Sequence, residues 1–320
     1  MPFWVTIIII SVVALLLLGG VIVSFIVVSP IAQRIFDKQW IRQNDEMFKR
    51  GCSDESIDYH LDMFNQGMAY RESVLDHIKE VSITSLGDKL VGEYYDFGFR
   101  KAIIVLPGRA ETCYYAAYYA STFIKAGYNV LAIDPRAHGL SEGKILTLGF
   151  LESIDTIEWA KFLHNEFGIE HICLYGLCGG GTCASLAFTS KDCPSYVDSF
   201  VADCIYYSFY DVNKRHIKDE GKPIYPFIFL MMHKIKKYCH VSGYKAAPIK
   251  MIKNVKVPTL FLAGENDIFS IPTKVEKLYK RSGSKKKQFV IVPHARHSHL
   301  RYDNLEVYEE NVINFLESNW

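Results

Sequence analysis

The pattern of apolar and polar positions begins with an uninterrupted apolar segment at the N-terminus. No side chain in residues 1–32 is charged, and residues 3–28 read FWVTIIIISVVALLLLGGVIVSFIVV. A helix of about 20 such residues crosses the roughly 30 Å hydrocarbon core of a bilayer. We therefore predict a single-pass membrane anchor over residues 3–29 that ends at Pro30.

A cleaved signal peptide is the alternative for this segment. A signal peptide has a basic start and an apolar core of about 7 to 15 residues, whereas this run is longer and nothing basic precedes it. The first lysines and arginines, Arg34, Lys38 and Arg42, all follow the span. That bias favours a cytoplasmic location for the rest of the chain.

Beyond the anchor the pattern changes twice. Residues 30–76 are charged and moderately periodic, which predicts a juxtamembrane helical linker. From residue 78 two short β-type runs, 78–83 and 90–95, flank a Gly87-Asp88 turn and predict a hairpin.

The remainder alternates short apolar runs with helical stretches. We expect strands near residues 102–106, 128–133, 171–174, 200–202, 259–263 and 289–292, and helices near 114–125, 151–166, 180–188, 273–280 and 305–318. This alternation is typical of an α/β domain with a mostly parallel sheet and helices on both faces. It extends over residues 77–320.

One long segment interrupts the alternation, at about residues 206–253. It is helical in pattern, rich in aromatic residues and rich in lysine. We interpret it as a cap inserted over the ends of the strands. Such a surface suits an anionic lipid and an acyl chain, although a cap that is apolar inside and solvated outside has the same composition.

The overall composition narrows the classes of function. The formal net charge is +1, so no global charge indicates a nucleic-acid partner. Several of the eight cysteines lie in apolar runs, as reduced and buried thiols do, and none has the spacing of a disulfide scaffold.

The most specific motif is a strand that runs into Gly176-Leu177-Cys178-Gly179-Gly180 and then into a helix. Glycines on both sides of a nucleophile permit the tight strand-to-helix turn called a nucleophile elbow. A glycine-rich turn that merely carries a buried cysteine is the alternative. The glycines do not form G-x-G-x-x-G, so a dinucleotide site is disfavoured.

An acid and a histidine follow in the order that a nucleophile elbow requires. The run VPTLFLAGENDIFSIP places Asp267 just past a strand, and VIVPHARHSHL places His297 in the loop after the next strand. Glu265 is a weaker choice for the acid, and we assign no catalytic role to His294 or His299. An irregular loop lacks the spacing of a histidine metal site, so no metal and no cofactor is expected.

With these motifs in order, residues 78–320 resemble the α/β-hydrolase superfamily, nearest to its monoacylglycerol lipase, lysophospholipase and serine aminopeptidase-like branch. The resemblance rests on the elbow, on the acid and histidine loops, and on AIIVLPGRAETCYYAAYYASTFIKAGYNVLAIDPRAHGLSEG. It implies the α/β-hydrolase fold with a Cys178-His297-Asp267 triad and an oxyanion hole made by the backbone amides of Gly179 and Arg109.

Two residues depart from the family pattern: Pro107 stands where a histidine is usual, and Cys178 stands where a serine is usual. Dienelactone hydrolases show that the fold accommodates a cysteine nucleophile. The resemblance therefore implies an esterase, lipase or thioesterase acting on a small-molecule or lipid acyl substrate. A peptidase of the same fold and a non-catalytic, redox-sensing protein are the alternatives.

Two further groups of residues lie outside the predicted triad, and the sequence leaves the role of the first open. Arg109 and Glu111 either orient a substrate head group or pair with each other. Asp134, Arg136, His138 and Ser141 are assigned to holding loops together.

Overall fold

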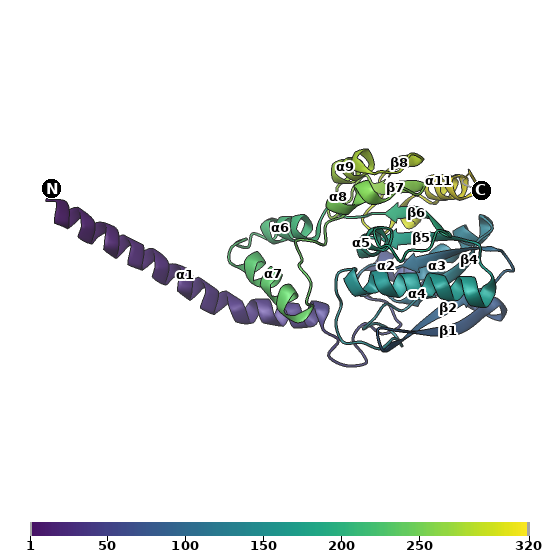
Figure 1. The fold of residues 1–320 in the computed structure, drawn as a ribbon, viewed down its shortest axis with the longest axis horizontal. Helices are drawn as coiled ribbons and strands as arrows, with labels where there is room; N and C mark the ends of the chain where they lie inside the picture. The colour runs from purple at the N-terminus through teal and green to yellow at the C-terminus, as the bar shows by residue number, and fades with distance from the viewer. Residues whose placement is uncertain (1, 319–320) are drawn as a thin grey trace.

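The computed structural model describes residues 2–318, and its centre is an eight-stranded sheet (Figure 1). The strand order is β1-β2-β4-β3-β5-β6-β7-β8. Strand β2 pairs antiparallel with both neighbours, and every other pair is parallel. The strands are β1 (Ile78–Ser85), β2 (Asp88–Tyr95), β3 (Lys101–Leu106), β4 (Asn129–Ile133), β5 (His171–Leu177), β6 (Val197–Asp203), β7 (Thr259–Gly264) and β8 (Lys287–Val292).

Helices cover both faces of the sheet, which is why its central strands are continuous apolar runs. One buried cluster joins the sheet to α3 (Cys113–Lys125) and α11 (Leu305–Ser318). A second joins the opposite face to α4 (Phe150–Phe167), α5 (Gly179–Ala187) and α9 (Pro272–Arg281). A short helix, α10 (Leu300–Asp303), leads into α11. The predicted sheet, hairpin and covering helices are confirmed.

The interruption between β6 and β7 is helical, as expected. It contains α6 (Phe209–Asp219), α7 (Phe227–Tyr238) and the short α8 (Pro248–Met251). Buried apolar residues of α6 and α7 form one cluster with Phe36 and Trp40 from the N-terminal helix. The cap is therefore attached to the N-terminal helix as well as to the sheet.

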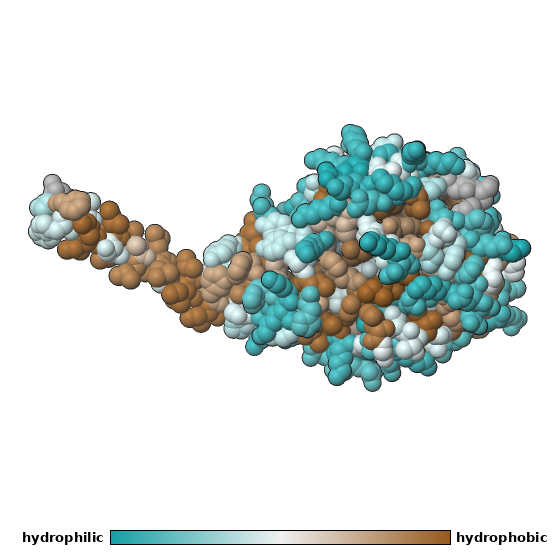
Figure 2. Space-filling view, in the orientation of Figure 1, coloured by the Kyte–Doolittle hydropathy of each residue, from teal (hydrophilic) through white to brown (hydrophobic). Residues whose placement is uncertain are grey.

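The N-terminal helix α1 (Phe3–Trp40) is longer than predicted, because it continues through Pro30. The turn after the proline is held by packing: Ala32, Phe36 and Trp40 are buried, and Trp40 stacks on Phe36. Before that turn the helix is exposed and apolar, and it projects from the body (Figures 1 and 2). By length and composition it is able to cross a membrane.

Residues 41–77, most of which fall in the segment predicted as a juxtamembrane linker over residues 30–76, pack on the body. Helix α2 (Asp58–Ser73) lies against α3, and Arg50 donates to the buried carboxylate of Asp134 at 2.8 Å. Arg42 donates to the carbonyls of Gly139 and Ser141, each at 3.0 Å. These partners lie far away in sequence, so the periodicity of the segment did not reveal them.

Candidate active site

The elbow has the geometry that its glycines predicted. Strand β5 ends at Leu177, α5 begins at Gly179, and Cys178 between them has a φ of 51°. Such a φ is unfavourable for a side-chain-bearing residue and indicates stored backbone strain. A Cβ on Gly180 would lie 2.0 Å from the Leu106 carbonyl oxygen, and one on Gly176 would lie 2.7 Å from Gly181. Only glycine fits at these two positions.

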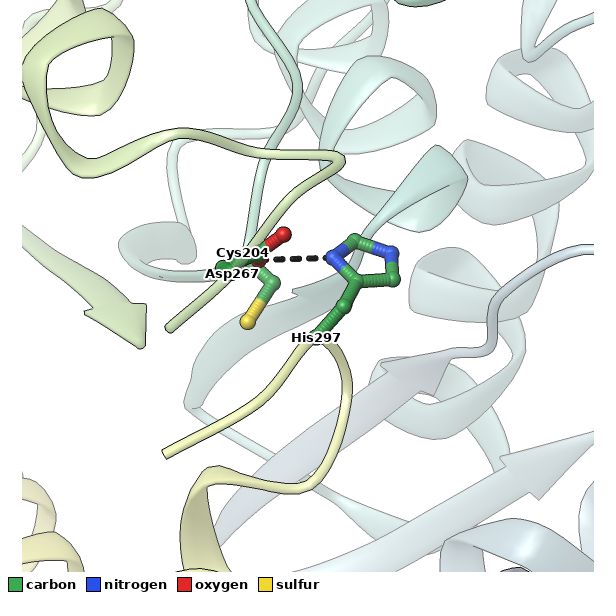
Figure 3. A group of neighbouring side chains, drawn as sticks. All are labelled: Cys204, Asp267 and His297. Carbon is green, nitrogen blue, oxygen red and sulfur yellow. Dashed lines mark hydrogen bonds and ion pairs between the residues drawn. The ribbon is translucent and has the colours of Figure 1, made fainter. Parts of the chain in front are cut away.

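The predicted acid and histidine are in direct contact. The Nδ1 atom of His297 lies 2.7 Å from Oδ2 of Asp267. Figure 3 marks this contact with a dashed line. The other carboxylate oxygen of Asp267 accepts hydrogen bonds from the backbone amides of Phe269 and Ser270, each at 2.7 Å. The turn after β7 therefore fixes the carboxylate and leaves Oδ2 for the histidine.

The third member, Cys178, faces the same imidazole. Burial alone lowers the pKa of His297, but the Cys178 thiolate, together with hydrogen bonds to Asp267 and Cys178, raises it well above the usual range. Because Nδ1 is engaged by Asp267, the Nε2 atom is the one available to the thiol. The structure thus brings Cys178, His297 and Asp267 together.

The two amides predicted for the oxyanion hole are free to bind. Within residues 2–318, neither the backbone N–H of Gly179 nor that of Arg109 has a hydrogen-bond acceptor. The neighbouring N–H of Gly108 is already taken, because Oε2 of Glu111 accepts from it at 2.7 Å. The carboxylate of Glu111 therefore fixes the backbone of this loop at Gly108.

His299 has a role that the sequence did not reveal. Its Nδ1 donates to the carbonyl of His297 at 2.6 Å, and its Nε2 lies 3.0 Å from Nδ1 of His60. Since Nδ1 of His299 carries the proton, His60 is the donor of the second bond. Burial lowers the pKa of His299 to about 4, and it also lowers that of His60. Helix α2 therefore holds the backbone of the loop that carries His297 through two histidines whose pKa values are lowered by burial.

His294 differs from these two histidines: it is exposed and lies 3.3 Å from Glu265. The Asp134 loop is structural, as expected. Ser141 Oγ donates to the Asp134 carbonyl at 2.7 Å, and Arg136 pairs with Asp155 at 2.7 Å.

Cys204 lies beside the acid and the histidine (Figure 3). Single ligand atoms of Cys204, Asp267 and His297 lie within 4.8 Å of one another, as in a metal site. However, burial and the carboxylates of Asp203 and Asp267 raise the pKa of Cys204 well above its usual range. Since Asp267 and His297 are already engaged with each other at 2.7 Å and Cys204 is fully buried, we assign Cys204 to packing behind the acid.

A cavity of about 770 Å³ opens onto Cys178 and His297. Its wall includes Trp40 at the end of α1 and Phe209 from α6. Ser53 and His60 from the N-terminal segment complete it. The cap, the end of α1 and the N-terminal segment therefore enclose the elbow together, and the cavity is large enough for a small organic ligand.

Two family models match the chain. The α/β-hydrolase fold model matches residues 101–224, and the serine aminopeptidase S33 model matches residues 246–303. The first includes the oxyanion loop and the elbow, and the second includes Asp267 and His297.

The chain is also similar to individual proteins. The uncharacterized protein YqkD of Bacillus subtilis is 25% identical over 219 residues, which is 68% of this chain and 71% of that protein. The esterase Pf2001 of Pyrococcus furiosus has a similar structure, with a TM-score of 0.63 and 24% identity over 78% of this chain and 93% of that one. An esterase of Exiguobacterium antarcticum gives a TM-score of 0.54 at 14% identity, over 75% and 100% of the two chains. The family models and the structural neighbours therefore agree on an α/β-hydrolase fold for this chain.

Proposed function

We propose that the protein is a membrane-anchored acyl hydrolase that cleaves carboxylic esters or thioesters with Cys178 as its nucleophile. The observation that carries this proposal is the strained elbow, which presents Cys178 to a histidine already fixed by Asp267 at 2.7 Å. A nucleophile, a base in contact with it and an acid that orients the base are the three parts of covalent acyl transfer.

The first half of the reaction follows from these positions. His297 takes the thiol proton on Nε2, and the Cys178 sulfur attacks the acyl carbonyl carbon. The carbonyl oxygen becomes an oxyanion, which accepts hydrogen bonds from the free amides of Gly179 and Arg109. The bond to the leaving group then breaks, His297 returns the proton to that group, and a thioester remains on Cys178.

In the second half, water hydrolyses the thioester. His297 removes a proton from the water, the resulting hydroxide adds to the thioester carbonyl, and the cysteine thiol leaves after regaining the proton. The carboxylic acid is released. Asp267 holds the imidazole in the required orientation throughout and stabilises its positive charge.

The enclosure of the site indicates the type of substrate. Cys178 packs at the edge of the apolar cluster that contains Phe209, Tyr206 and Trp40. An apolar acyl chain fits such a wall, because burying its surface is favourable. The end of α1, the helix that carries the proposed anchor, belongs to the same wall, which supports a substrate taken from the membrane surface.

A peptidase is the second candidate, because the model that matches residues 246–303 is that of serine aminopeptidases. The chemistry at Cys178 is the same for an amide, and the two functions differ only in the leaving group. Paired p-nitrophenyl ester and aminoacyl p-nitroanilide substrates separate them.

The test of the proposal uses the full chain in detergent micelles. We expect hydrolysis of p-nitrophenyl butyrate, loss of activity after treatment with iodoacetamide, and loss of activity in Cys178→Ala. Cys193→Ser is the matched control, since Cys193 is a partly buried free thiol that does not line the cavity. Full activity in Cys178→Ala would refute the assignment of the nucleophile.

A further inference from the structure

Arg109 plays two parts at the edge of the cavity. Its backbone amide belongs to the oxyanion hole, and its side chain is exposed while also lining the cavity that contains Cys178. The side chain is therefore accessible to solvent and to a ligand in the cavity. The guanidinium lies close enough to Cys178 for the thiolate to stabilise its charge.

Arg109 is unlike the other charged side chains around this cavity. Within residues 2–318 its guanidinium has no hydrogen bond and no ion pair. Each of the others has a partner: Asp134 with Arg50, Arg136 with Asp155, Arg296 with Asp303, Glu152 with Thr147, Asp54 with Ser56, and Glu111 with the amide of Gly108. The wall therefore has one arginine whose charge is not matched by a carboxylate.

Glu111 lies two positions from Arg109 in the sequence, but its carboxylate makes a different contact. Glu111 turns its carboxylate toward the Gly108 amide, with which it makes a bond of 2.7 Å. Burial raises the pKa of Glu111 to about 7, although that hydrogen bond opposes the shift. A substantial fraction of Glu111 is therefore uncharged at neutral pH, and it does not neutralise the arginine. The two residues do not form the ion pair that was one reading of the sequence.

An exposed guanidinium that lines the cavity and has no protein partner is available to an incoming anion. The protein groups packed around Arg109 lower its pKa, and the Cys178 thiolate opposes that shift. A planar guanidinium binds carboxylate or phosphate oxygens through two parallel hydrogen bonds. Arginine is thus suited to hold an anionic group near the scissile carbonyl.

We propose that Arg109 forms an anion-binding subsite and that the preferred substrates are acyl esters or thioesters carrying a carboxylate or phosphate close to the scissile bond. This inference rests on the proposed function and names its substrate class. The backbone of Arg109 lies beside the carbonyl oxygen of the substrate and its side chain lies in the cavity. The anion consequently binds within the length of one side chain from the reacting carbonyl.

The first test measures the subsite without any hydrolysis. Iodoacetate and iodoacetamide are nearly the same size, but only iodoacetate is an anion. We would measure the alkylation rate of Cys178 in the full chain by peptide mass spectrometry with both reagents. In Arg109→Gln the ratio of the iodoacetate rate to the iodoacetamide rate should fall by about ten- to a hundredfold, as expected for loss of a charge-assisted hydrogen bond. Arg109→Lys, which keeps the charge, should restore part of the ratio.

Lys218→Gln is the matched control, because it removes the same charge from an exposed position of α6 that does not line the cavity. Its ratio should equal that of the unchanged protein. An equal ratio in Arg109→Gln as well would overturn the subsite. Circular dichroism spectra of all variants identify any that fail to fold, and Arg109→Lys then carries the comparison.

The second test distinguishes the two kinds of anion by kcat/KM. The phosphate arm compares a lysophosphatidate with the monoacylglycerol of the same acyl chain. The carboxylate arm compares p-nitrophenyl hydrogen adipate with p-nitrophenyl hexanoate. We expect the anionic member of at least one pair to be favoured, and Arg109→Gln to abolish that preference. Hydrolysis without any such preference would refute the subsite and leave the hydrolase intact. If the alkylation ratio depends on Arg109 but none of these esters is hydrolysed, the subsite stands and the proposed function is refuted.

Discussion

Cys178 is presented by a motif of adjacent residues, in which Gly176 lets strand β5 approach helix α5 and Gly180 lets that helix approach the Leu106 carbonyl of β3. The loop of His297 is held differently. The ring of His299 donates a hydrogen bond to the backbone carbonyl of His297. His299 is in turn hydrogen-bonded to His60, which lies 239 positions earlier in the chain. Local sequence thus builds the nucleophile, and a long-range contact from the N-terminal segment supports the base. The two regions should respond differently to substitution.

The largest expected effect is a loss of kcat when either of the residues that activate Cys178 is replaced. His297→Gln or Asp267→Asn should lower kcat by about a thousand- to ten-thousandfold, because the thiol loses its base or the base loses its orientation. The measurement is steady-state hydrolysis of p-nitrophenyl butyrate. Glu265→Gln is the matched control, since the Glu265 side chain is exposed and, within residues 2–318, makes its polar contacts with His294. A loss in this control equal to that in Asp267→Asn would contradict the choice of acid.

The next effect tests the packing of the elbow. In Gly180→Ala the new methyl group would meet the Leu106 carbonyl oxygen at 2.0 Å, so strand β3 or helix α5 must move. We expect the free energy of unfolding to fall by about 1–3 kcal/mol or more. A Cβ on Gly179 meets nothing within 4 Å, so Gly179→Ala should leave the midpoint of urea unfolding nearly unchanged. Similar midpoints for both variants would show that the elbow is not tightly packed.

A smaller effect is expected in the N-terminal support. His60→Ala leaves the ring nitrogen of His299 without its donor and should lower the free energy of unfolding by about 1–3 kcal/mol. Because the support holds the carbonyl of His297, KM or kcat should also change, which a segment acting only as a linker would not cause. Urea unfolding and ester hydrolysis of the same preparation give both values.

The same histidines make stability depend on pH. The pKa values of His60 and His299 are lowered in the folded protein, the latter to about 4, whereas an unfolded histidine titrates near 6.5. Above pH 6.5 both states are neutral. As the pH falls from 6.5 toward 4 the unfolded state takes up protons first, so stability is lost by up to about 1.4 kcal/mol per pH unit for each histidine. In His299→Gln the free energy of unfolding should decrease less steeply as the pH falls. The same pH dependence in this variant and in the unchanged protein would contradict the role given to His299.

The smallest effect is expected at the exposed edge of α2. Asp62 accepts a hydrogen bond from the Tyr302 hydroxyl at 2.8 Å, in contact with solvent. Asp62→Asn should change the free energy of unfolding by less than about 1 kcal/mol. It is also the matched comparison for His60→Ala, because both residues lie on the same helix. A larger loss of unfolding free energy in Asp62→Asn than in His60→Ala would contradict the claim that His60 supports the loop of His297.

The features that the sequence predicted are those encoded over short distances. The strands are apolar runs with turns at their ends, the elbow is a run of glycines around one cysteine, and Asp267 and His297 each follow a strand. The contact between Asp267 and His297 follows because the two strands before them, β7 and β8, are parallel neighbours, which brings their carboxyl ends to one edge of the sheet.

The features that were missed depend on tertiary contacts. Pro30 suggested a helix end, but packing of Phe36 and Trp40 extends α1 past it. No spacing in the sequence relates His60 to His299. The sequence also does not reveal that Arg109 and Glu111 form no ion pair. The Glu111 carboxylate accepts a hydrogen bond from the Gly108 amide, and only the folded loop determines this contact.

The most direct test of the central claim is to trap the acyl-enzyme. The full chain would be mixed with an excess of p-nitrophenyl butyrate, quenched in acid within milliseconds, and mapped by peptide mass spectrometry. We predict a butyryl group on the peptide that contains Cys178, released by neutral hydroxylamine as a thioester is, and absent from Cys178→Ala. Hydrolysis at the normal rate with the acyl group on another residue would contradict the claim that Cys178 is the nucleophile.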